Sequence, residues 1–495
     1  MSAAPATAAA ASLDPIDLRE AYLRSNESIT DEVEGHLEVV EGELPAGLRG
    51  VLFRNGPGRL EVHGQPYGHP FDGDGHLNRF AFTDQGVVYR NRYVRTREFL
   101  DEEAARKILY RNFGTNIPGG FRKNLLRMRF KNVANTSVVM HGGQLRALWE
   151  GGLPHRIDPH TLDTLARDDL GGALQNDSSF IDRLIAPELP YSAHPRLDPA
   201  TGDLFNFGTV SGMKPALMLY RQNHAGAVVQ RERLVLPAMS FLHDFTVTPR
   251  FRVFFLTPVA FDLPRTLLGL APPASTLHAM PGPTTILLLP RRGTQARSYS
   301  ARPCFIFHFA NAFEDGPYVV VDADRMDRLP SVPVASKPRP GQFAAEYPRT
   351  ILTRFIIDTR SGLIEERALT DYTGELPTIN PAYWTRPHRY TWSLGTSLDQ
   401  REPFSTGLLK VDAETRSSVF RDLRPNLTGE PIFVPRPGSA AEDDGWILSM
   451  CYDPRLHTGE LLVLDAADLR TVCRLRMPHH SPLGFHGTWV GALSS

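Results

Sequence analysis

The sequence predicts an all-β fold of the propeller type. Short β-branched or aromatic runs, bounded by Gly, Asp, Asn and Pro, recur from about Val39 onward, at residues 253–256, 305–309, 318–322, 351–357 and 446–450. A turn phrase, an apolar residue before Asp and then Thr or Ser, recurs at residues 157–161, 197–202, 357–362 and 411–415, with a looser copy at 452–459. The 40 Gly and 41 Pro residues favour many turns over long helices. Repeated hairpins fit propeller blades better than a sandwich, although their irregular spacing leaves the blade number open.

The chain is predicted to form one large domain behind an N-terminal extension, although 495 residues would also allow several small domains. Residues 1–38 are predicted to be a partly disordered tail and arm, because the Ala-rich start lacks the basic region of a signal peptide. Residues 39–495 are predicted to be the propeller. Two segments, at about 100–131 and 258–283, interrupt its strand pattern, and such insertions are more often lids or binding loops than spacers.

Charge and cysteine content exclude some functions. The 54 basic residues against 55 acidic ones give a net charge of −1, which argues against a nucleic-acid partner. Three cysteines, Cys304, Cys451 and Cys473, suit a reducing compartment. No apolar stretch is long enough to span a bilayer. We therefore expect a cytoplasmic protein, with no obligate protein partner implied.

Four of the 17 histidines stand in apolar, strand-like phrases far apart in the chain: His194, His243, His308 and His486. An imidazole between Phe residues is costly to bury unless something takes its lone pair. A metal on the propeller axis would do so, since several blades can each supply one ligand. From the pattern alone, ordinary core histidines remain an open alternative, and the other 13 histidines are expected to have no metal role.

Several longer phrases identify a family. In order along the chain, the sequence resembles the carotenoid cleavage oxygenase family from about residue 44 to residue 489. The phrases that carry the resemblance are LPAGLRGVLFRNGPG (44–58), HPFDGDGHLNRFAF (69–82), KNVANTSV (131–138), ALWEGGLPHRIDPHTLDTL (147–165), AHPRLDP (193–199), FLHDFTVTP (241–249), FHFANAFED (307–315), ELPTINP (375–381), GEPIFVPRPG (429–438) and GFHGTW (484–489).

The resemblance implies a seven-bladed β-propeller with a helical and loop dome over an axial Fe²⁺ that the four histidines hold. Four imidazoles suit Fe²⁺, and the family pattern places glutamates behind them, matching Glu150, Glu375 and Glu430. Such carboxylates accept the free imidazole N–H and fix the ring. Solvated surface carboxylates are the alternative, but apolar neighbours of Glu150 and Glu430 favour the role behind the ligands. Thr136 matches a threonine that limits what binds at the open iron position.

The resemblance also implies the reaction, O₂-dependent cleavage of one C=C bond in a conjugated alkene to give two carbonyl products. The phrases look most like the bacterial apocarotenoid oxygenases, which cut the central 15,15′ bond of apocarotenals to give retinal. Trp149 stands where the stilbene-cleaving branch has a phenol-binding lysine, which suits a hydrocarbon polyene. We expect Phe71, Phe113, Trp149 and Phe241 to line the substrate tunnel, with simple core packing as the alternative.

Three alternatives remain open from the sequence. One alternative is a stilbene-cleaving dioxygenase, and another is a different carotenoid or apocarotenoid cleaver of the same fold. The third is a propeller that serves as a non-enzymatic binding scaffold. Leucines in the 258–283 insertion, including Leu267 and Leu268, either reach a membrane surface or pack as a dome over the iron.

Overall fold

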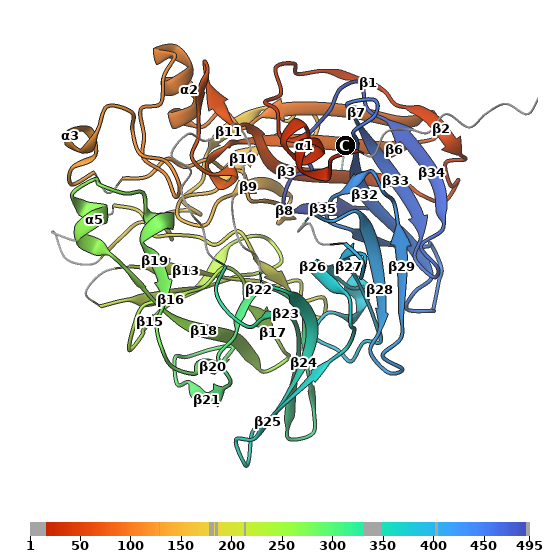
Figure 1. The fold of residues 1–495 in the computed structure, drawn as a ribbon. Coiled ribbons are helices and arrows are strands. Elements are labelled where there is room, and N and C mark those ends of the chain that lie inside the picture. Colours follow the sequence, from red (N-terminus) through yellow and green to blue (C-terminus); the bar gives the residue numbers. More distant parts are fainter. Residues whose placement is uncertain are drawn as a thin grey trace, which may run out of the picture.

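Seven antiparallel β-sheets of four or more strands surround a common axis in the computed structural model (Figure 1). The structure describes residues 16–127, 129–177, 183, 187–211, 214–330, 348–400 and 404–491. The predicted seven-bladed propeller is confirmed. The first 15 residues of the predicted N-terminal tail lie outside the described part of the chain.

Most sheets are built from strands that are consecutive in the chain, and the bounds of the strands are as follows. The first sheet contains β1 (Glu34–His36), β3 (Gly50–Arg59), β6 (Asp74–Thr83), β7 (Gly86–Tyr93) and β35 (Gly487–Val490). The second contains β8 (Ser137–His141), β9 (Gln144–Leu148), β10 (His155–Ile157) and β11 (Thr164–Arg167), and the third β12 (Arg196–Leu197), β13 (Leu204–Val210), β14 (Ala216–Gln222) and β15 (Val228–Val235). The fourth contains β16 (Ser240–Phe241), β17 (Thr246–Val247), β18 (Phe251–Phe261), β19 (Leu277–Ala279), β20 (Thr284–Pro290) and β21 (Arg297–Ala301).

The remaining sheets complete the ring. The fifth contains β22 (Phe305–Asp315), β23 (Tyr318–Met326), β24 (Thr350–Asp358) and β25 (Ile364–Ala368), and the sixth β26 (Thr373–Thr378), β27 (Tyr390–Thr396), β28 (Gly407–Asp412) and β29 (Ser418–Asp422). The seventh contains β2 (Glu38–Gly42), β30 (Leu427–Thr428), β31 (Ile432–Pro435), β32 (Gly445–Asp453), β33 (Thr458–Asp465) and β34 (Thr471–Arg476). A separate hairpin joins β4 (Glu61–Val62) to β5 (Gln65–Pro66).

Both ends of the chain close the ring by strand pairing. The C-terminal strand β35 pairs with β3 in the first sheet, with Val51 opposite Val490. The N-terminal strand β2 pairs with β34 in the last sheet, with Val39 opposite Leu475. The first and last sheets therefore each contain strands from both ends of the sequence, which closes the ring.

The repeated turn phrase lies where an Asp caps the reversal between two strands. The Asp158 carboxylate accepts hydrogen bonds from the backbone N–H groups of His160 and Thr161, both at 2.8 Å. Asp358 does the same with Arg360 N–H at 2.8 Å, between β24 and β25, and Gly362 then takes a φ of 80°. Asp side chains therefore initiate these turns as the sequence predicts, and glycine supplies the positive φ.

The core lies between neighbouring sheets. Phe255 of β18 packs against Phe309 of β22 and Phe355 of β24, with ring centroids 5.3 and 5.0 Å apart. The facing side chains of these two sheets form one buried apolar cluster that also includes Val253 and Ile286. Aromatic and β-branched residues on one face of each strand thus hold adjacent blades together.

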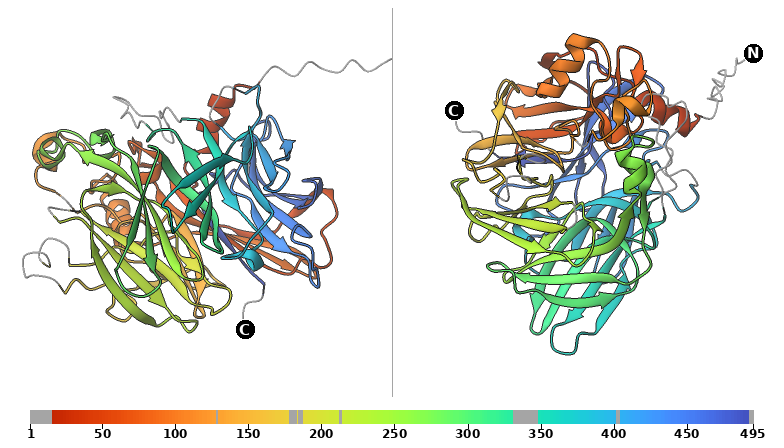
Figure 2. Two further views of the ribbon diagram at one scale, coloured as in Figure 1. Left: turned by 90° about the horizontal axis from the view of Figure 1, so that it is seen from below. Right: turned by 90° about the vertical axis from the view of Figure 1, so that its left-hand side faces the viewer.

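The two insertions carry most of the helices and contact each other. Outside the strands lie α1 (Leu18–Ser25), α2 (Arg97–Ala105), α3 (Phe121–Asn124), α5 (Leu263–Leu267), η1 (Pro70–Asp72), η2 (Pro273–Thr276) and η3 (Pro381–Tyr383). α3 and α5 lie side by side in Figures 1 and 2, and the backbone N–H of Leu126 donates to the Leu267 carbonyl at 2.8 Å. The buried guanidinium of Arg111 donates to the carbonyls of Thr266 and Ala271 at 3.0 and 3.1 Å. One buried arginine therefore ties the first insertion to the second.

No helix in the described part of the chain has the length and apolarity needed to cross a membrane. The division of the chain into an arm and a single propeller domain stays a prediction.

Candidate metal centre

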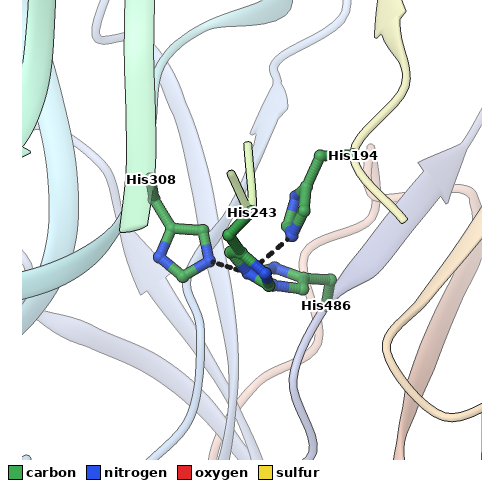
Figure 3. A group of neighbouring side chains, drawn as sticks. All are labelled: His194, His243, His308 and His486. Atoms are coloured by element: carbon green, nitrogen blue, oxygen red, sulfur yellow. Dashed lines mark hydrogen bonds between the residues drawn. The ribbon is translucent and has the colours of Figure 1, made fainter. Parts of the chain in front are cut away.

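Four histidines from four different sheets point toward one position on the axis (Figure 3). His194 lies two residues before β12, His243 two residues after β16, His308 within β22, and His486 directly before β35. The Nε2 atom of His243 lies 2.9 Å from Nε2 of His194 and 3.2 Å from Nε2 of His308. One ligand atom from each of the four lies within 4.8 Å of the others.

Three glutamates, the ones named from the sequence, stand behind three of these imidazoles. His308 Nδ1 lies 2.6 Å from Oε2 of Glu375, and His486 Nδ1 lies 2.8 Å from Oε1 of Glu430. His243 Nδ1 lies 3.2 Å from Oε1 of Glu150. Because a carboxylate only accepts, the rings of His308 and His486 carry their proton on Nδ1 and turn the Nε2 lone pair toward the axis, whereas the His243–Glu150 contact lacks hydrogen-bond geometry.

This donor set fits a divalent transition metal. An imidazole with its proton on Nδ1, as in His308 and His486, offers only a lone pair at Nε2, and four Nε2 atoms that converge on one position suit a cation among them. Nitrogen ligands at adjacent corners of an octahedron with bonds of about 2.1 Å lie about 3.0 Å apart. The two Nε2 separations of 2.9 and 3.2 Å are close to that value.

Burial favours the neutral, metal-binding form of two of these imidazoles, His194 and His486. It lowers the pKa of His486 to about 4, against the opposing effect of Glu430. Burial and the neighbouring histidines lower the pKa of His194 well below its ordinary value. For His308, burial lowers the pKa, but the Glu375 carboxylate and its hydrogen bond outweigh that effect and raise it overall.

Glu430 has a cationic partner that sequence reasoning missed. The buried guanidinium of Arg54, on β3, forms an ion pair with Glu430 and also donates to the Phe485 carbonyl at 3.1 Å. Glu430 in addition accepts the Gly487 backbone N–H at 2.9 Å. Burial raises the pKa of Glu430, but Arg54 and His486 together lower it below the ordinary value, so the carboxylate stays charged.

Glu375 has a buried acid beside it. Asp324, on β23, is fully buried near Glu375. Burial and then the negative charge of Glu375 raise the pKa of Asp324 well above its ordinary value. The neutral form of Asp324 is therefore favoured, and its hydroxyl can donate to the carboxylate behind His308.

Two site residues have other surroundings. His194 has no glutamate behind it in the family pattern, and Glu150 is 3.9 Å from its Nε2 atom, too far for a hydrogen bond. Thr136 is buried, and its backbone carbonyl accepts the N–H of His486 at 3.3 Å. Its hydroxyl donates to the Asn135 side chain at 3.1 Å. The methyl group is the other, apolar end of the Thr136 side chain.

Comparison with known proteins decides the family. The sequence model described as "Retinal pigment epithelial membrane protein" matches residues 26–491. The apocarotenoid-15,15′-oxygenase of Synechocystis sp. is 36% identical over 95% of this chain and 96% of its own length. The chain belongs to the carotenoid oxygenase family. The recognition from sequence, and with it the prediction of an oxygenase, is confirmed.

Further members of the carotenoid oxygenase family are similar along nearly the whole chain. Resveratrol cleavage oxygenase 1 of Aspergillus fumigatus is 30% identical over 92% of this chain and 93% of its own length. The crystal structure of cobalt-substituted Synechocystis ACO superposes with a TM-score of 0.89 at 35% identity, covering 95% of this chain and 98% of that one.

An apolar cavity of about 470 Å³ opens beside the histidines. Its lining includes Thr136, Glu150 and all four aromatic residues expected at the substrate tunnel, Phe71, Phe113, Trp149 and Phe241. The rings of Phe71 and Phe113 stack with their centroids 6.1 Å apart. Both insertions take part in the wall, the first through Phe113 and the second through Pro273.

Other lining residues were not named from the sequence. Phe307 and Phe485 each directly precede a metal-centre histidine, and Phe307 packs edge-on against His243 with centroids 5.2 Å apart. Their position next to His308 and His486 is a signal that the sequence does contain. Leu376, directly after Glu375, also lines the cavity, as do Met239 and Leu394, which lie in phrases without a comparable signal.

A second, larger cavity of about 960 Å³ reaches the same centre and is lined in part by His194, His308, Glu430 and His486. Charged groups line it too, among them Arg196, which pairs with the buried Asp244. The four-histidine centre therefore borders both the apolar cavity and the larger, more polar cavity.

Proposed function

We propose that this chain is a non-haem Fe²⁺ dioxygenase that cleaves the 15,15′ double bond of apocarotenals with O₂ and releases retinal. The observation that carries the proposal is the apolar cavity whose wall includes His243, His308 and His486. An extended hydrocarbon and a redox metal ion require a site of this kind, and the similarity to the Synechocystis apocarotenoid-15,15′-oxygenase supports this substrate class.

In the proposed enzyme, His194, His243, His308 and His486 hold the Fe²⁺. Iron bound there would supply O₂ activation, and in the proposed reaction the two oxygen atoms of O₂ would appear in the two carbonyl products, so no external reductant would be needed. Glu150, Glu375 and Glu430 keep three imidazoles oriented and deprotonated at Nε2. The centre then has a metal charge of +2 with neutral ligands, and the carboxylates behind them offset it.

The protein's own contribution to selectivity is position. Aromatic and aliphatic side chains of Phe71, Phe113, Phe241 and Phe307 exclude water and hold a polyene along the cavity, so that one double bond lies beside the metal centre. The Thr136 methyl group narrows the open side of the centre and limits which small ligands reach it.

The lining favours a hydrocarbon over a phenol. Neither Lys nor Arg occurs among the described residues that line this cavity, and Trp149 stands where a phenol-binding lysine is expected in stilbene cleavers. A phenol held in this cavity therefore meets no cationic side chain, although polar ones such as Asn112 and Ser240 are present. Stilbene cleavage remains the second candidate because of the similarity to the Aspergillus resveratrol cleavage oxygenase.

Product analysis separates the candidates. The iron-loaded enzyme is incubated under O₂ with an apocarotenal and, separately, with a hydroxystilbene, and the aldehydes are separated by chromatography. We expect retinal from the first and no benzaldehydes from the second. Benzaldehydes with no retinal would overturn the proposal, and a chain without iron or turnover would indicate a binding scaffold.

We further propose that the enzyme acts in the cytoplasm and takes its substrate from a membrane surface. Large apolar side chains of both insertions are exposed next to each other: Phe121, Leu125, Leu126, Leu263, Leu268 and Leu270. Basic side chains of Arg122 and Lys123 accompany them on α3, which suits an anionic lipid surface. These insertions also wall the cavity, so a lipid-dissolved substrate would have a short path to it.

Co-sedimentation with liposomes tests this contact. We expect the double variant Leu126→Ser/Leu268→Ser to lose binding, whereas Leu363→Ser, at an equally exposed leucine on the β24–β25 turn, keeps it. Equal partitioning of both variants and the unaltered chain would refute the membrane contact without affecting the cleavage proposal.

A further inference from the structure

A second group of metal-ligating side chains lies outside the four-histidine centre. Glu27 follows α1 on the N-terminal arm, His457 lies in the turn between β32 and β33, and His480 follows β34. One ligand atom from each residue lies within 4.8 Å of the other two. Three segments far apart in the sequence thus bring two imidazoles and a carboxylate together.

The contacts among these residues are close but leave room for an ion. The Nε2 atom of His457 lies 3.6 Å from Oε2 of Glu27. The rings of His457 and His480 stack with centroids 4.4 Å apart. His480 Nε2 lies 3.1 Å from the Glu27 backbone carbonyl, so the arm is held to His480 even without the carboxylate.

A buried phenol contacts the other ring nitrogen of His457. Its Nδ1 lies 2.8 Å from the hydroxyl of Tyr452, which has no exposed surface. Burial raises the pKa of Tyr452 to about 12, so the hydroxyl stays neutral and can either donate to Nδ1 or accept from it. When the phenol accepts the Nδ1 hydrogen, the Nε2 lone pair of His457 faces Glu27, the arrangement in which metal-binding histidines are oriented from behind.

The imidazoles are neutral near pH 7. Burial, together with nearby Arg24, lowers the pKa of His457 against the effect of Glu27, and burial also lowers that of His480. His457 moreover has a φ of 50°, a left-handed backbone conformation in which Gly or Asn is the less strained choice. The turn therefore carries an imidazole at a position where backbone energetics favour another residue.

We propose that Glu27, His457 and His480 form a site for a divalent transition-metal ion of the Zn²⁺ class, separate from the iron centre. Two imidazoles, one carboxylate and water are a common zinc donor set. The ion would join the N-terminal arm to the last sheet. Arg24, whose guanidinium donates to the Pro454 carbonyl at 3.4 Å, is the nearby cation that opposes binding.

An ion there would also support one wall near the substrate cavity. Tyr22, on α1, lines a cavity of about 270 Å³ together with Phe71 and Phe485, which also line the substrate cavity. Tyr22 of α1 stacks on Phe404, which lies between β27 and β28 of the sixth sheet, with ring centroids 4.5 Å apart, and Ala21 joins the same buried cluster as Leu427 and Tyr452 of the last sheet. Metal binding behind α1 would hold this wall against the propeller.

Metal counting tests the site on the untagged, iron-loaded holoenzyme. The protein is dialysed against ZnCl₂, and zinc and iron per chain are measured by inductively coupled plasma mass spectrometry. We expect the unaltered chain to bind one more zinc per chain than the double variant His457→Gln/His480→Gln, with equal iron in both. His160→Gln, at an exposed turn histidine, is the matched control and should bind as much zinc as the unaltered chain.

Two further measurements keep the test independent of folding defects. Glu27→Gln, a change at an exposed side chain, should weaken zinc binding about tenfold, and Arg24→Gln should tighten it. Zinc should slow amide hydrogen exchange in residues 18–26 of the unaltered chain and not of the double variant. Equal zinc in the unaltered chain and the double variant, or zinc gained only as iron is lost, would overturn the proposal, whatever the substrate of the enzyme.

Discussion

Replacing Arg54 with Met should destabilise the protein through Glu430, a residue 376 positions away in the sequence. Arg54 is 1% exposed, and its guanidinium is the cation that pairs with the Glu430 carboxylate in the described part of the chain. Glu430 in turn holds the ring of His486. The substitution removes the cation but leaves the carboxylate in place and buried.

The expected loss of stability follows from the unpaired charge that remains on Glu430. Breaking a buried ion pair from one side costs about 3–5 kcal/mol, because the remaining charge is uncompensated. Replacing Glu430 with Gln as well leaves a neutral acceptor for the N–H groups of His486 and Gly487. We therefore expect the double variant Arg54→Met/Glu430→Gln to be more stable than Arg54→Met alone by about 2 kcal/mol.

Urea unfolding, followed by circular dichroism, is measured for the unaltered chain, Arg54→Met, Glu430→Gln and the double variant. Iron per chain after dialysis gives a second readout. The pKa of Glu430 in the folded state is lowered, so the pair stabilises the fold above the ordinary pKa of a glutamate, and this contribution is lost as the pH falls through the folded value. Without Arg54 the burial effect dominates, so iron loss on acidification should begin at a higher pH. A double variant as unstable as Arg54→Met alone would refute the reasoning.

Three further outcomes are expected. His308→Ala should abolish iron retention and O₂ uptake while His457→Ala leaves both near the unaltered level, and equal effects in metal analysis would contradict the division of the histidines. Gly56→Ala should lower the stability by about 3 kcal/mol in thermal unfolding, because its Cβ would lie 2.2 Å from a backbone carbon, whereas Gly35→Ala meets no atom within 4 Å and should not. Asp324→Asn should be at least as stable as the unaltered chain at pH 8, since the raised pKa of this buried carboxyl makes its ionisation costly as the pH rises. A large loss of stability in the Asn variant would show that the carboxyl is charged in the folded protein.

The sequence predicts the long strands of the blades better than the short ones. The five apolar runs named from the sequence all lie in strands, β18, β22, β23, β24 and β32, because these strands are mostly buried between neighbouring sheets. Several strands close to the axis, such as β12, β16 and β17, are only two residues long. Two residues are too few to show any period, so the blade number came from the family resemblance and not from spacing.

The site was predictable where chemistry shows in the local phrase. His308 is conspicuous because Phe residues flank it, and the glutamates were located by their matching phrases. Arg54 and Asp324 were missed, since each lies in an ordinary strand and acquires its role only when another sheet brings Glu430 or Glu375 beside it. Such pairs depend on tertiary contact, which a single sequence does not record.

The centre takes one residue from each of the seven blades. The four histidines belong to the third, fourth, fifth and first sheets, and Glu150, Glu375 and Glu430 belong to the second, sixth and seventh. His486 directly precedes β35, the strand that closes the ring on β3, and Arg54 of β3 pairs with Glu430 of the last sheet. An ion bound by these histidines would therefore join the two blades where the chain ends meet. Metal binding and ring closure should then stabilise each other, because both depend on the position of His486.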